Sequence, residues 1–144
     1  MYIPKIPNNT LYDEISEIIR LIPEIVCEYG EESVKFYNPV PEQDVINWEI
    51  KNNIILPVNI KSWFEFSNGF DIIADNMYKI ENFIVTHPDL PDDFVIIGIL
   101  NDESLCFSKE TGEIIRYDTM ERRRYNDFKC FLKDTLIRGM KKAI

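Results

Sequence analysis

A chain of 144 residues with 45% apolar and 12% aromatic residues can bury a core as one domain, and this composition excludes intrinsic disorder. We therefore expect a single domain over residues 1–144. The formal net charge of −9 disfavours nucleic acid as a partner, because a negative surface repels phosphate groups. No apolar run reaches the roughly 20 residues that a membrane-spanning helix needs, so we expect no membrane association.

The charge is unevenly distributed along the chain. Residues 1–100 carry 6 Lys/Arg against 17 Asp/Glu, a net charge of −11, whereas residues 101–144 carry 10 against 8, a net charge of +2. An acidic surface favours a basic protein partner, because opposite charges accelerate the encounter. The alternative is that the charge only keeps a small protein soluble.

Cysteine usage and the N-terminal sequence indicate the compartment. The three cysteines are odd in number and widely separated, which suits a reducing compartment better than a disulfide framework. The first ten residues, MYIPKIPNNT, lack the apolar core of a secretion signal. We therefore expect a cytoplasmic protein. The cysteines are Cys27, Cys106 and Cys130.

The first predicted element is a helix over residues 11–30. Thr10 and Asp13 have the spacing of a capping box at its start, and apolar residues then recur at helical spacing. Pro23 interrupts this stripe and predicts a kink or a restart just before it. A brief extended segment over residues 34–37 follows.

Two shorter helices are predicted next. Pro41 begins one of them and Asn52–Asn53 end it. Leu56–Pro57 begins the other, because proline lacks only an N–H that the first helical turn does not use. Asn68–Gly69 ends it, since these residues adopt the left-handed conformation most readily. The expected buried faces contain Val45, Ile46 and Trp48 in the first, and Ile60, Trp63 and Phe64 in the second.

Beyond Gly69 the periodicity changes from helical to extended. Residues 78–83 alternate as a half-buried strand would. Residues 86–93 contain two prolines and predict a loop. A capped helix followed by a β-meander is therefore the predicted centre of the fold.

Three further strands and a helix complete the prediction. The apolar run FVIIGIL over residues 94–100 is typical of a central strand, in which Gly98 indicates a bulge or a close backbone approach. Residues 105–107 and 113–117 predict a hairpin with Gly112 at the end of its connection. The last helix is capped by Asp127 and buries one face: Phe128, Phe131, Leu132, Leu136 and Met140.

The sequence lacks the residue patterns of common metal and phosphate sites. His87 is the only histidine, and no two cysteines have the spacing of metal ligands. The isolated glycines form neither a P-loop nor a dinucleotide motif. The basic stretch Arg122–Arg124 is too short to dominate an acidic domain, so we interpret it as a solvated connection into the last helix. We expect no cofactor and no metal.

Glu49 and a set of aromatic residues are the more interesting candidates. Glu49 follows Trp48 at the seam between the apolar and polar faces of its predicted helix. A structural role, with its carboxylate bonded to a nearby turn or backbone, outweighs a catalytic one. The aromatic side chains could stack on a ligand or anchor a partner, but their helical spacing favours the core. By elimination, the residues favour a binding module over an enzyme. The aromatic set is Trp48, Trp63, Phe64, Phe66 and Phe70.

The order of these motifs resembles the Smi/Knr family of the SUKH superfamily, which is named for fungal cell-wall regulators and is abundant in bacteria as immunity proteins. The resemblance covers about Pro41 to Asp118. Family members often have an Asp–Gly turn after the Ile–Gly strand, whereas this chain has Asn101-Asp102-Glu103. The motifs that carry the resemblance are Glu49, Leu56–Pro57, Asn68–Gly69, Ile97–Gly98, Thr111-Gly112-Glu113 and Tyr117.

The resemblance implies an α+β fold, with a curved, mostly antiparallel β-sheet packed against helices and with N- and C-terminal helices added. Many bacterial relatives neutralise a cognate toxin, often a nuclease, by binding it tightly, and fungal relatives are interaction hubs. Neither role requires catalysis. In such a fold the Glu, Leu–Pro and Asn–Gly positions act mainly as cap, helix start and helix stop.

The favoured hypothesis is an immunity protein, or antitoxin, that binds and neutralises a basic toxin domain, such as a nuclease, through an acidic surface. The first alternative is a regulatory interaction module acting on a host protein. The second is a small carboxylate-based hydrolase or ligand-binding protein, which predicts a deep polar cleft and a carboxyl group with a perturbed pKa. We expect a monomer or a weak homodimer. The candidate partner contacts are Glu49, Asp71, Asp75, Glu81, Asp102 and Glu103.

Overall fold

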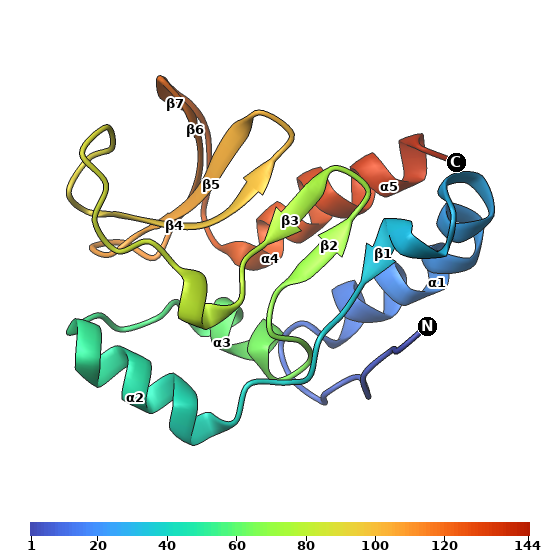
Figure 1. Cartoon of the computed structure of the whole chain (residues 1–144), viewed down its shortest axis with the longest axis horizontal. Coiled ribbons are helices and arrows are strands. Elements are labelled where there is room, and N and C mark those ends of the chain that lie inside the picture. Colours follow the sequence, from blue (N-terminus) through green and yellow to red (C-terminus); the bar gives the residue numbers. More distant parts are fainter.

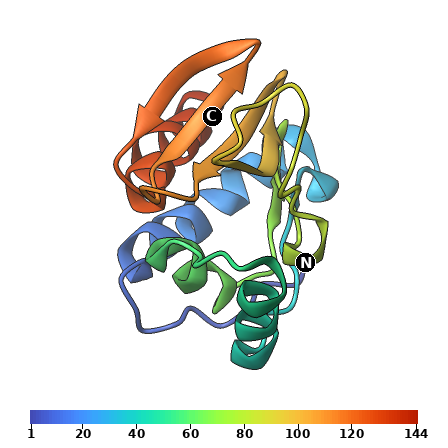
Figure 2. The ribbon, with the colours of Figure 1, turned by 90° about the vertical axis from the view of Figure 1, so that its left-hand side faces the viewer.

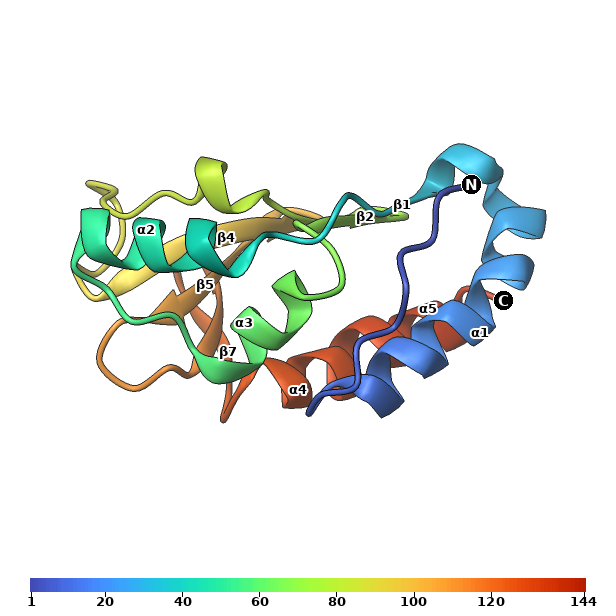
Figure 3. The same ribbon diagram turned by 90° about the horizontal axis from the view of Figure 1, so that it is seen from below.

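Helices pack against a curved antiparallel sheet in the computed structural model, which describes all 144 residues (Figure 1). The sheet has seven strands in the order β1 to β7, so each strand pairs with its neighbours in the sequence. Figure 3 shows α1, α4 and α5 together on one side of the sheet. The predicted α+β class is confirmed. None of the helices combines the length and the apolar character that crossing a bilayer requires.

The first helix, α1 (Tyr12–Tyr29), runs through Pro23 without interruption. Of the predicted kink or restart near Ile22, the restart is therefore wrong. A proline removes one helical hydrogen bond, and packing of the apolar stripe on both sides of Pro23 outweighs that loss. The predicted end is confirmed, since Gly30 terminates the helix with φ of 95°. The buried stripe includes Ile15, Ile18, Leu21, Ile22 and Ile25.

The capping box predicted at the start of α1 is also wrong. The Asn9 Oδ1 atom accepts the N–H of Leu11 at 2.9 Å. The Thr10 hydroxyl instead donates to Asn59 Oδ1 at 2.7 Å. Thr10 thus ties the N-terminal segment to α3 (Val58–Phe64) and is not available to cap its own helix.

The helix α2 (Glu42–Asn52) begins after Pro41 and ends at Asn53, which has φ of 52°. These predicted boundaries are confirmed, but Ile46 is 37% exposed, so its predicted burial is wrong. Helix α3 begins after Pro57 as predicted and stops at Phe64, before the expected Asn68–Gly69.

The short strands come first in the sheet. A 3-10 turn over Glu31–Ser33 leads into β1 (Val34–Lys35), which pairs with β2 (Phe70–Ile72). Strand β3 (Asp75–Met77) follows β2 after a two-residue turn. The strand predicted over residues 78–83 is wrong, because Ile80–Asn82 form the 3-10 turn η2. The predicted loop over residues 86–93 is confirmed.

Four longer strands form the rest of the sheet. They are β4 (Phe94–Leu100), β5 (Glu103–Ser108), β6 (Ile114–Asp118) and β7 (Met120–Tyr125). The register of β4 and β5 shifts between Ile96 and Gly98, which confirms the predicted bulge. Strand β7 contains Arg122–Arg124 and was not predicted, so the interpretation of this stretch as a connection is wrong.

The C-terminal helix has three parts, α4 (Phe128–Phe131), a π-helical segment (Leu132–Ile137) and α5 (Arg138–Lys142). Its predicted cap is confirmed, because Asp127 Oδ1 accepts the N–H of Cys130 at 2.8 Å. The π-helical segment was not predicted. Segments of this kind interrupt the regular hydrogen-bond pattern and are often found at functional sites.

Apolar side chains pack on both faces of the sheet. The larger cluster lies beneath the helices and contains most of the predicted aromatic core. Of those aromatics, Trp63, Phe64, Phe66 and Phe70 are fully buried, while Trp48 is half-buried. A smaller cluster on the other face contains Phe94, Ile96, Cys106 and Ile115. Most of these aromatic residues are therefore core, as predicted.

Candidate functional site: an acidic cleft at the end of the sheet

The strand register divides the predicted acidic contacts between the two faces of the sheet. Asp71 pairs with Asn76, whereas Asp75 pairs with Ile72. Paired residues of an antiparallel sheet point to the same face, and Ile72 is only 1% exposed. Asp75 therefore points toward the helices and Asp71 points away from them. The six candidate partner contacts therefore do not all lie on one face of the sheet.

Three of those six acids do converge on one cleft. A cavity of about 570 Å³ opens between the β4–β5 turn and the C-terminal helix. Its acidic groups are Asp75, Asp102, Glu103 and the additional residue Asp118. We call this cavity the acidic cleft. The remaining lining residues are Leu100, Asn101, Arg116, Arg122, Thr135 and Gly139.

A short turn brings two of the acids to the rim of the acidic cleft. Leu100 pairs with Glu103, so Asn101 and Asp102 alone connect β4 to β5. Asn101 has φ of 55°, a conformation that asparagine adopts more easily than most residues. Asn101 thus takes the left-handed position of the turn. Asp102 is exposed at the tip.

Polar side chains from several elements form a connected network in the acidic cleft. Arg116 Nε donates to Glu103 Oε1 at 2.9 Å, and Arg116 Nη1 donates to the Tyr125 hydroxyl at 3.5 Å. The Tyr125 hydroxyl is in turn bonded to the Thr135 hydroxyl of the π-helical segment. Glu103 is therefore neutralised within the fold, and the network fixes the C-terminal helix against the sheet.

Asp75 is the carboxyl group of the acidic cleft that is partly buried without a hydrogen-bond donor. It makes no side-chain hydrogen bond in the structure. Its partial burial raises its pKa above the ordinary 3.8, and the nearby charge of Arg116 opposes that rise. A partly buried carboxylate without a hydrogen-bonded partner attracts a cation more strongly than a fully solvated one.

Replacing Asp75 with asparagine is expected to stabilise the fold at neutral pH. Because burial raises the folded-state pKa of Asp75, the folded protein holds this proton to higher pH than the unfolded chain. Its contribution to the free energy of unfolding therefore falls as pH rises through the folded-state pKa. Urea unfolding at about pH 3 and about pH 7 measures the difference. The variant should be more stable than the parent only at the higher pH, and an equal difference at both would contradict the argument.

Asp71 lies on the opposite face of the sheet and is bonded within the fold. Its Oδ2 atom accepts the hydroxyl of Tyr37 at 2.6 Å, and its Oδ1 atom accepts the side-chain amide of Asn76. Burial and the hydrogen bond to Asp71 raise the pKa of Tyr37 to about 12. Asp71 thus connects β2 with neighbouring segments and is separated from the acidic cleft by the sheet.

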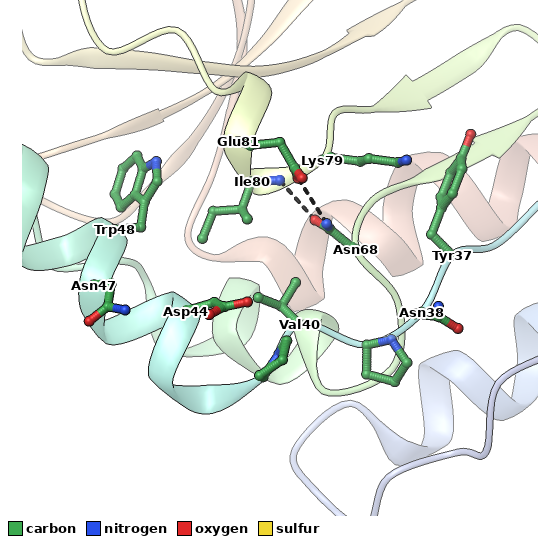
Figure 4. A pocket seen from close by; sticks show the side chains of 12 residues that line it. Tyr37, Asn38, Val40, Asp44, Asn47, Trp48, Asn68, Lys79, Ile80 and Glu81 are labelled. Atoms are coloured by element: carbon green, nitrogen blue, oxygen red, sulfur yellow. Dashed lines mark hydrogen bonds between the residues drawn. The ribbon is translucent and has the colours of Figure 1, made fainter.

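Glu81 lies in a second groove, of about 490 Å³, between α2 and η2 (Figure 4). Asn68 Nδ2 donates to Glu81 Oε1 at 2.9 Å, and Asn68 Oδ1 accepts the N–H of Ile80 at 2.8 Å. Lys79 Nζ lies 4.6 Å from the centre of the Tyr37 ring. Most charged groups of this groove therefore already have partners. Asn68 holds η2 in place and does not end α3.

Glu49 joins the end of α2 to the start of α3. Its Oε2 atom accepts the N–H of Leu56 at 2.7 Å and lies 3.0 Å from Lys61 Nζ. The side chain is 14% exposed. The structural interpretation of Glu49 is therefore confirmed, and little of its carboxylate remains for a partner.

Replacing Glu49 with alanine is expected to lower the free energy of unfolding by about 1–2 kcal/mol, because the Leu56 N–H loses a charge-assisted acceptor. Glu49→Gln is the matched control, since its amide oxygen can still accept that N–H, and it should lose less. Chemical unfolding of both variants measures the difference. Equal losses in the two would show that the acceptor at this position is unimportant.

The other residues considered from the sequence have structural partners. His87 Nδ1 accepts the N–H of Asp89 at 3.1 Å. Burial raises the pKa of the Cys106 thiol to about 12, which leaves it protonated and unreactive at neutral pH. No three His, Cys, Asp or Glu side chains are grouped so that they could hold a metal ion. The three arginines of β7 form ion pairs: Arg122 with Asp118, Arg123 with Asp134, and Arg124 with both Glu113 and Glu121.

Sequence reasoning missed part of the acidic cleft. The hydrogen-bond network of the cleft is formed by Arg116, Tyr125 and Thr135, which come from separate elements. Two of these elements, β7 and the π-helical segment, were not predicted. The stretch that forms β7 does carry a cluster of charges in the sequence. Comparison of the chain with models of known protein families gives no match, and comparison with curated proteins gives none either.

Proposed function

We propose that this protein is a non-catalytic, cytoplasmic protein-binding domain, an immunity protein of the Smi/Knr type that neutralises a cognate bacterial toxin. The observation that carries the proposal is an open cleft in which Asp75 and Asp102, which form no ion pair, lie beside the paired acids Glu103 and Asp118. The curved antiparallel sheet backed by helices supports it, because the resemblance in the sequence implies this fold class.

The acidic cleft suits a basic partner for electrostatic reasons. Asp102 is exposed at the rim, where it would attract an approaching cationic surface. Asp75 lies deeper and lacks a hydrogen-bond donor, so an incoming lysine or arginine would gain a charged acceptor there. Many nucleases hold their substrate phosphates with basic residues, and a protein that covers those residues blocks the enzyme without catalysis. A stable complex of this kind buries about 1,600 Å², an area that a domain of this size can provide.

Co-expression with the toxin candidates encoded next to this gene tests the proposal. We expect the parent chain to restore growth and to co-purify with one of them. Asp102→Lys should weaken the complex at least about tenfold, because it reverses a charge at the rim. Asp92→Lys is the matched control, since it makes the same charge change in the exposed 86–93 loop. It should retain protection.

Two results would count against this function. The first is the absence of a complex with every adjacent candidate. The second is equal protection by Asp102→Lys, Asp92→Lys and the parent, which would remove the acidic cleft from the interface.

A second candidate function, binding of a small cationic ligand, has one observation in its favour. Asp75 is a carboxyl group of raised pKa in a polar cleft, which is the feature expected of a ligand-binding or hydrolytic site. Thermal-shift screening with polyamines and amino-acid amines tests it. Stabilisation that is lost in Asp75→Asn would favour the ligand, while no stabilisation would leave protein binding as the better account.

A further inference from the structure

The groove between α2 and η2 contains a carboxylate that has no partner in the fold. The Asp44 side chain is exposed and makes neither a hydrogen bond nor an ion pair, whereas Glu81 is bonded to Asn68. Figure 4 shows the Asp44 carboxylate directed from α2 toward Val40 in the groove. The volume of about 490 Å³ lies within the usual range of ligand-binding pockets.

Trp48 contributes a hydrogen-bond donor to the same groove. Its ring is half-buried and lies 5.9 Å from the ring of Phe83. Its Nε1–H donates to no acceptor in the fold, although the atom is not buried. Figure 4 shows this nitrogen on the edge of the ring that faces Ile80. An indole N–H can only donate, so it is available to an acceptor on a bound molecule.

Apolar side chains lie beside these two polar groups. Val40 and Ile80 line the groove and are buried, a surface that suits the methylene stem of a long side chain. The only basic residue of the groove is Lys79, whose Nζ atom lies over the Tyr37 ring. Figure 4 shows Tyr37 and Trp48 at opposite ends of the groove. The end next to α2 is therefore acidic and complementary to a cationic side chain.

We propose that this groove binds an extended segment of a partner protein, and that an arginine of the segment pairs with Asp44. The guanidinium would donate to the Asp44 carboxylate in a charge-assisted hydrogen bond, while its stem lies along Val40 and Ile80. Arginine suits the groove better than lysine because its five N–H groups can serve two acceptors. The second acceptor is Glu81 Oε2 on the facing wall, which Asn68 leaves free.

The conformation of the segment follows from the unpaired donor of Trp48. A segment in the polyproline II conformation has no internal hydrogen bonds, so one of its backbone carbonyl groups can accept the Trp48 Nε1–H. Grooves lined by aromatic residues recognise segments of this kind. Because the contact is small, we expect a dissociation constant on the order of 100 µM for a short peptide.

The proposal is separate from the proposed function. The groove and the acidic cleft share no lining residue, and Figure 2 shows α2 at the margin of the molecule, on the side away from the C-terminal helix. Its test needs no toxin.

A ¹⁵N–¹H correlation spectrum of the full chain, titrated with acetyl-Ala-Pro-Arg-Pro-Ala-amide to about 2 mM, tests the proposal. The chain has two tryptophans, so the spectrum contains two indole N–H signals, which Trp48→Phe assigns. The Trp48 signal should move on binding. The Trp63 signal should stay, because its Nε1–H donates to the carbonyl of Gly69 at 3.3 Å in the core. The same peptide with glutamine in place of arginine should bind at least about tenfold more weakly.

Two variants distinguish the proposed pair from a general attraction between a basic peptide and an acidic protein. Asp44→Asn should raise the dissociation constant at least about threefold. Glu42→Gln is the matched control, because it removes one charge from the same first turn of α2 but does not line the groove. It should bind the peptide as the parent does. Circular dichroism establishes that both variants are folded.

Four results would overturn the proposal. One is the absence of a Trp48 shift at the highest peptide concentration, and another is equal binding of the arginine and glutamine peptides. The third is an equal loss of affinity in Asp44→Asn and Glu42→Gln. The fourth is binding of arginine amide alone as tightly as the peptide, which would show that the groove holds a small cation and not an extended segment.

Discussion

Replacing Trp63 with alanine is expected to lower the free energy of unfolding by about 3–5 kcal/mol. Trp63 is fully buried, and its ring centre lies 5.3 Å from Phe66, 5.4 Å from Phe70 and 6.1 Å from Phe128. These contacts join α3 to β2 and to the C-terminal helix. The substitution would remove the largest side chain at this junction and leave a cavity that its rigid neighbours cannot fill.

Urea unfolding followed by fluorescence measures this loss, because Trp48 remains as a reporter in the Trp63→Ala variant. Trp48→Ala is the matched control. Trp48 is only half-buried and has a single aromatic neighbour, Phe83 at 5.9 Å, so its removal should cost clearly less. Similar losses in the two variants would contradict the central position assigned to Trp63.

Replacing Gly98 with alanine is expected to lower the free energy of unfolding by about 3 kcal/mol through overpacking. A Cβ atom at this position would collide with the backbone oxygen of Asn76 and lie 3.0 Å from the Cα atom of Met77. Both belong to β3, which pairs with β4 through Met77 and Gly98. Since the obstacle is backbone, no side-chain rotation can relieve it, and the two strands must separate.

Gly139→Ala supplies the control for this prediction. A Cβ atom at Gly139 meets nothing within 4 Å, and alanine favours a helix by about 1 kcal/mol over glycine. We therefore expect Gly139→Ala to be neutral or stabilising. Thermal unfolding compares the two variants, and hydrogen exchange shows whether the amides of β3 and β4 lose protection in Gly98→Ala. A stable Gly98→Ala protein with unchanged protection would be inconsistent with the close approach of the strands.

The helices were largely predictable because their boundaries depend on local residue chemistry. Three helices begin directly after residues whose types favour a helix start, Pro41, Pro57 and Asp127, and one helix ends at Gly30. The β2–β3 hairpin was missed because its turn, Ile73–Ala74, contains no residue typical of turns. Ile73 adopts φ of 54°, which a β-branched residue rarely does. Pairing of the flanking strands imposes this conformation, and a local sequence pattern cannot indicate it.

The candidate site was predictable only in part, because the pairing register of the strands, and not the amino-acid composition, decides which acidic side chains lie close together. The sequence identified Asp75, Asp102 and Glu103, and the fold brings them together. Asp71 was a candidate contact as well, but the tight turn between β2 and β3 places it on the opposite face of the sheet. Strand β7 was missed because all of its residues before Tyr125 are exposed, whichever face they point to, so apolar and polar positions do not alternate along it.

The contact between the first and the last helix has a consequence for synthesis in the cell. Tyr29 donates to the carbonyl of Ala143 at 3.1 Å, and Lys141 lies 3.2 Å from Glu17; Figure 1 shows α1 and α5 side by side. A nascent chain emerges from the ribosome N-terminus first. The apolar side of α1 therefore stays uncovered until α5 (Arg138–Lys142) has been synthesised and has left the ribosome. Thr135 and Gly139 belong to the same late segment, so the acidic cleft is incomplete until they too have emerged.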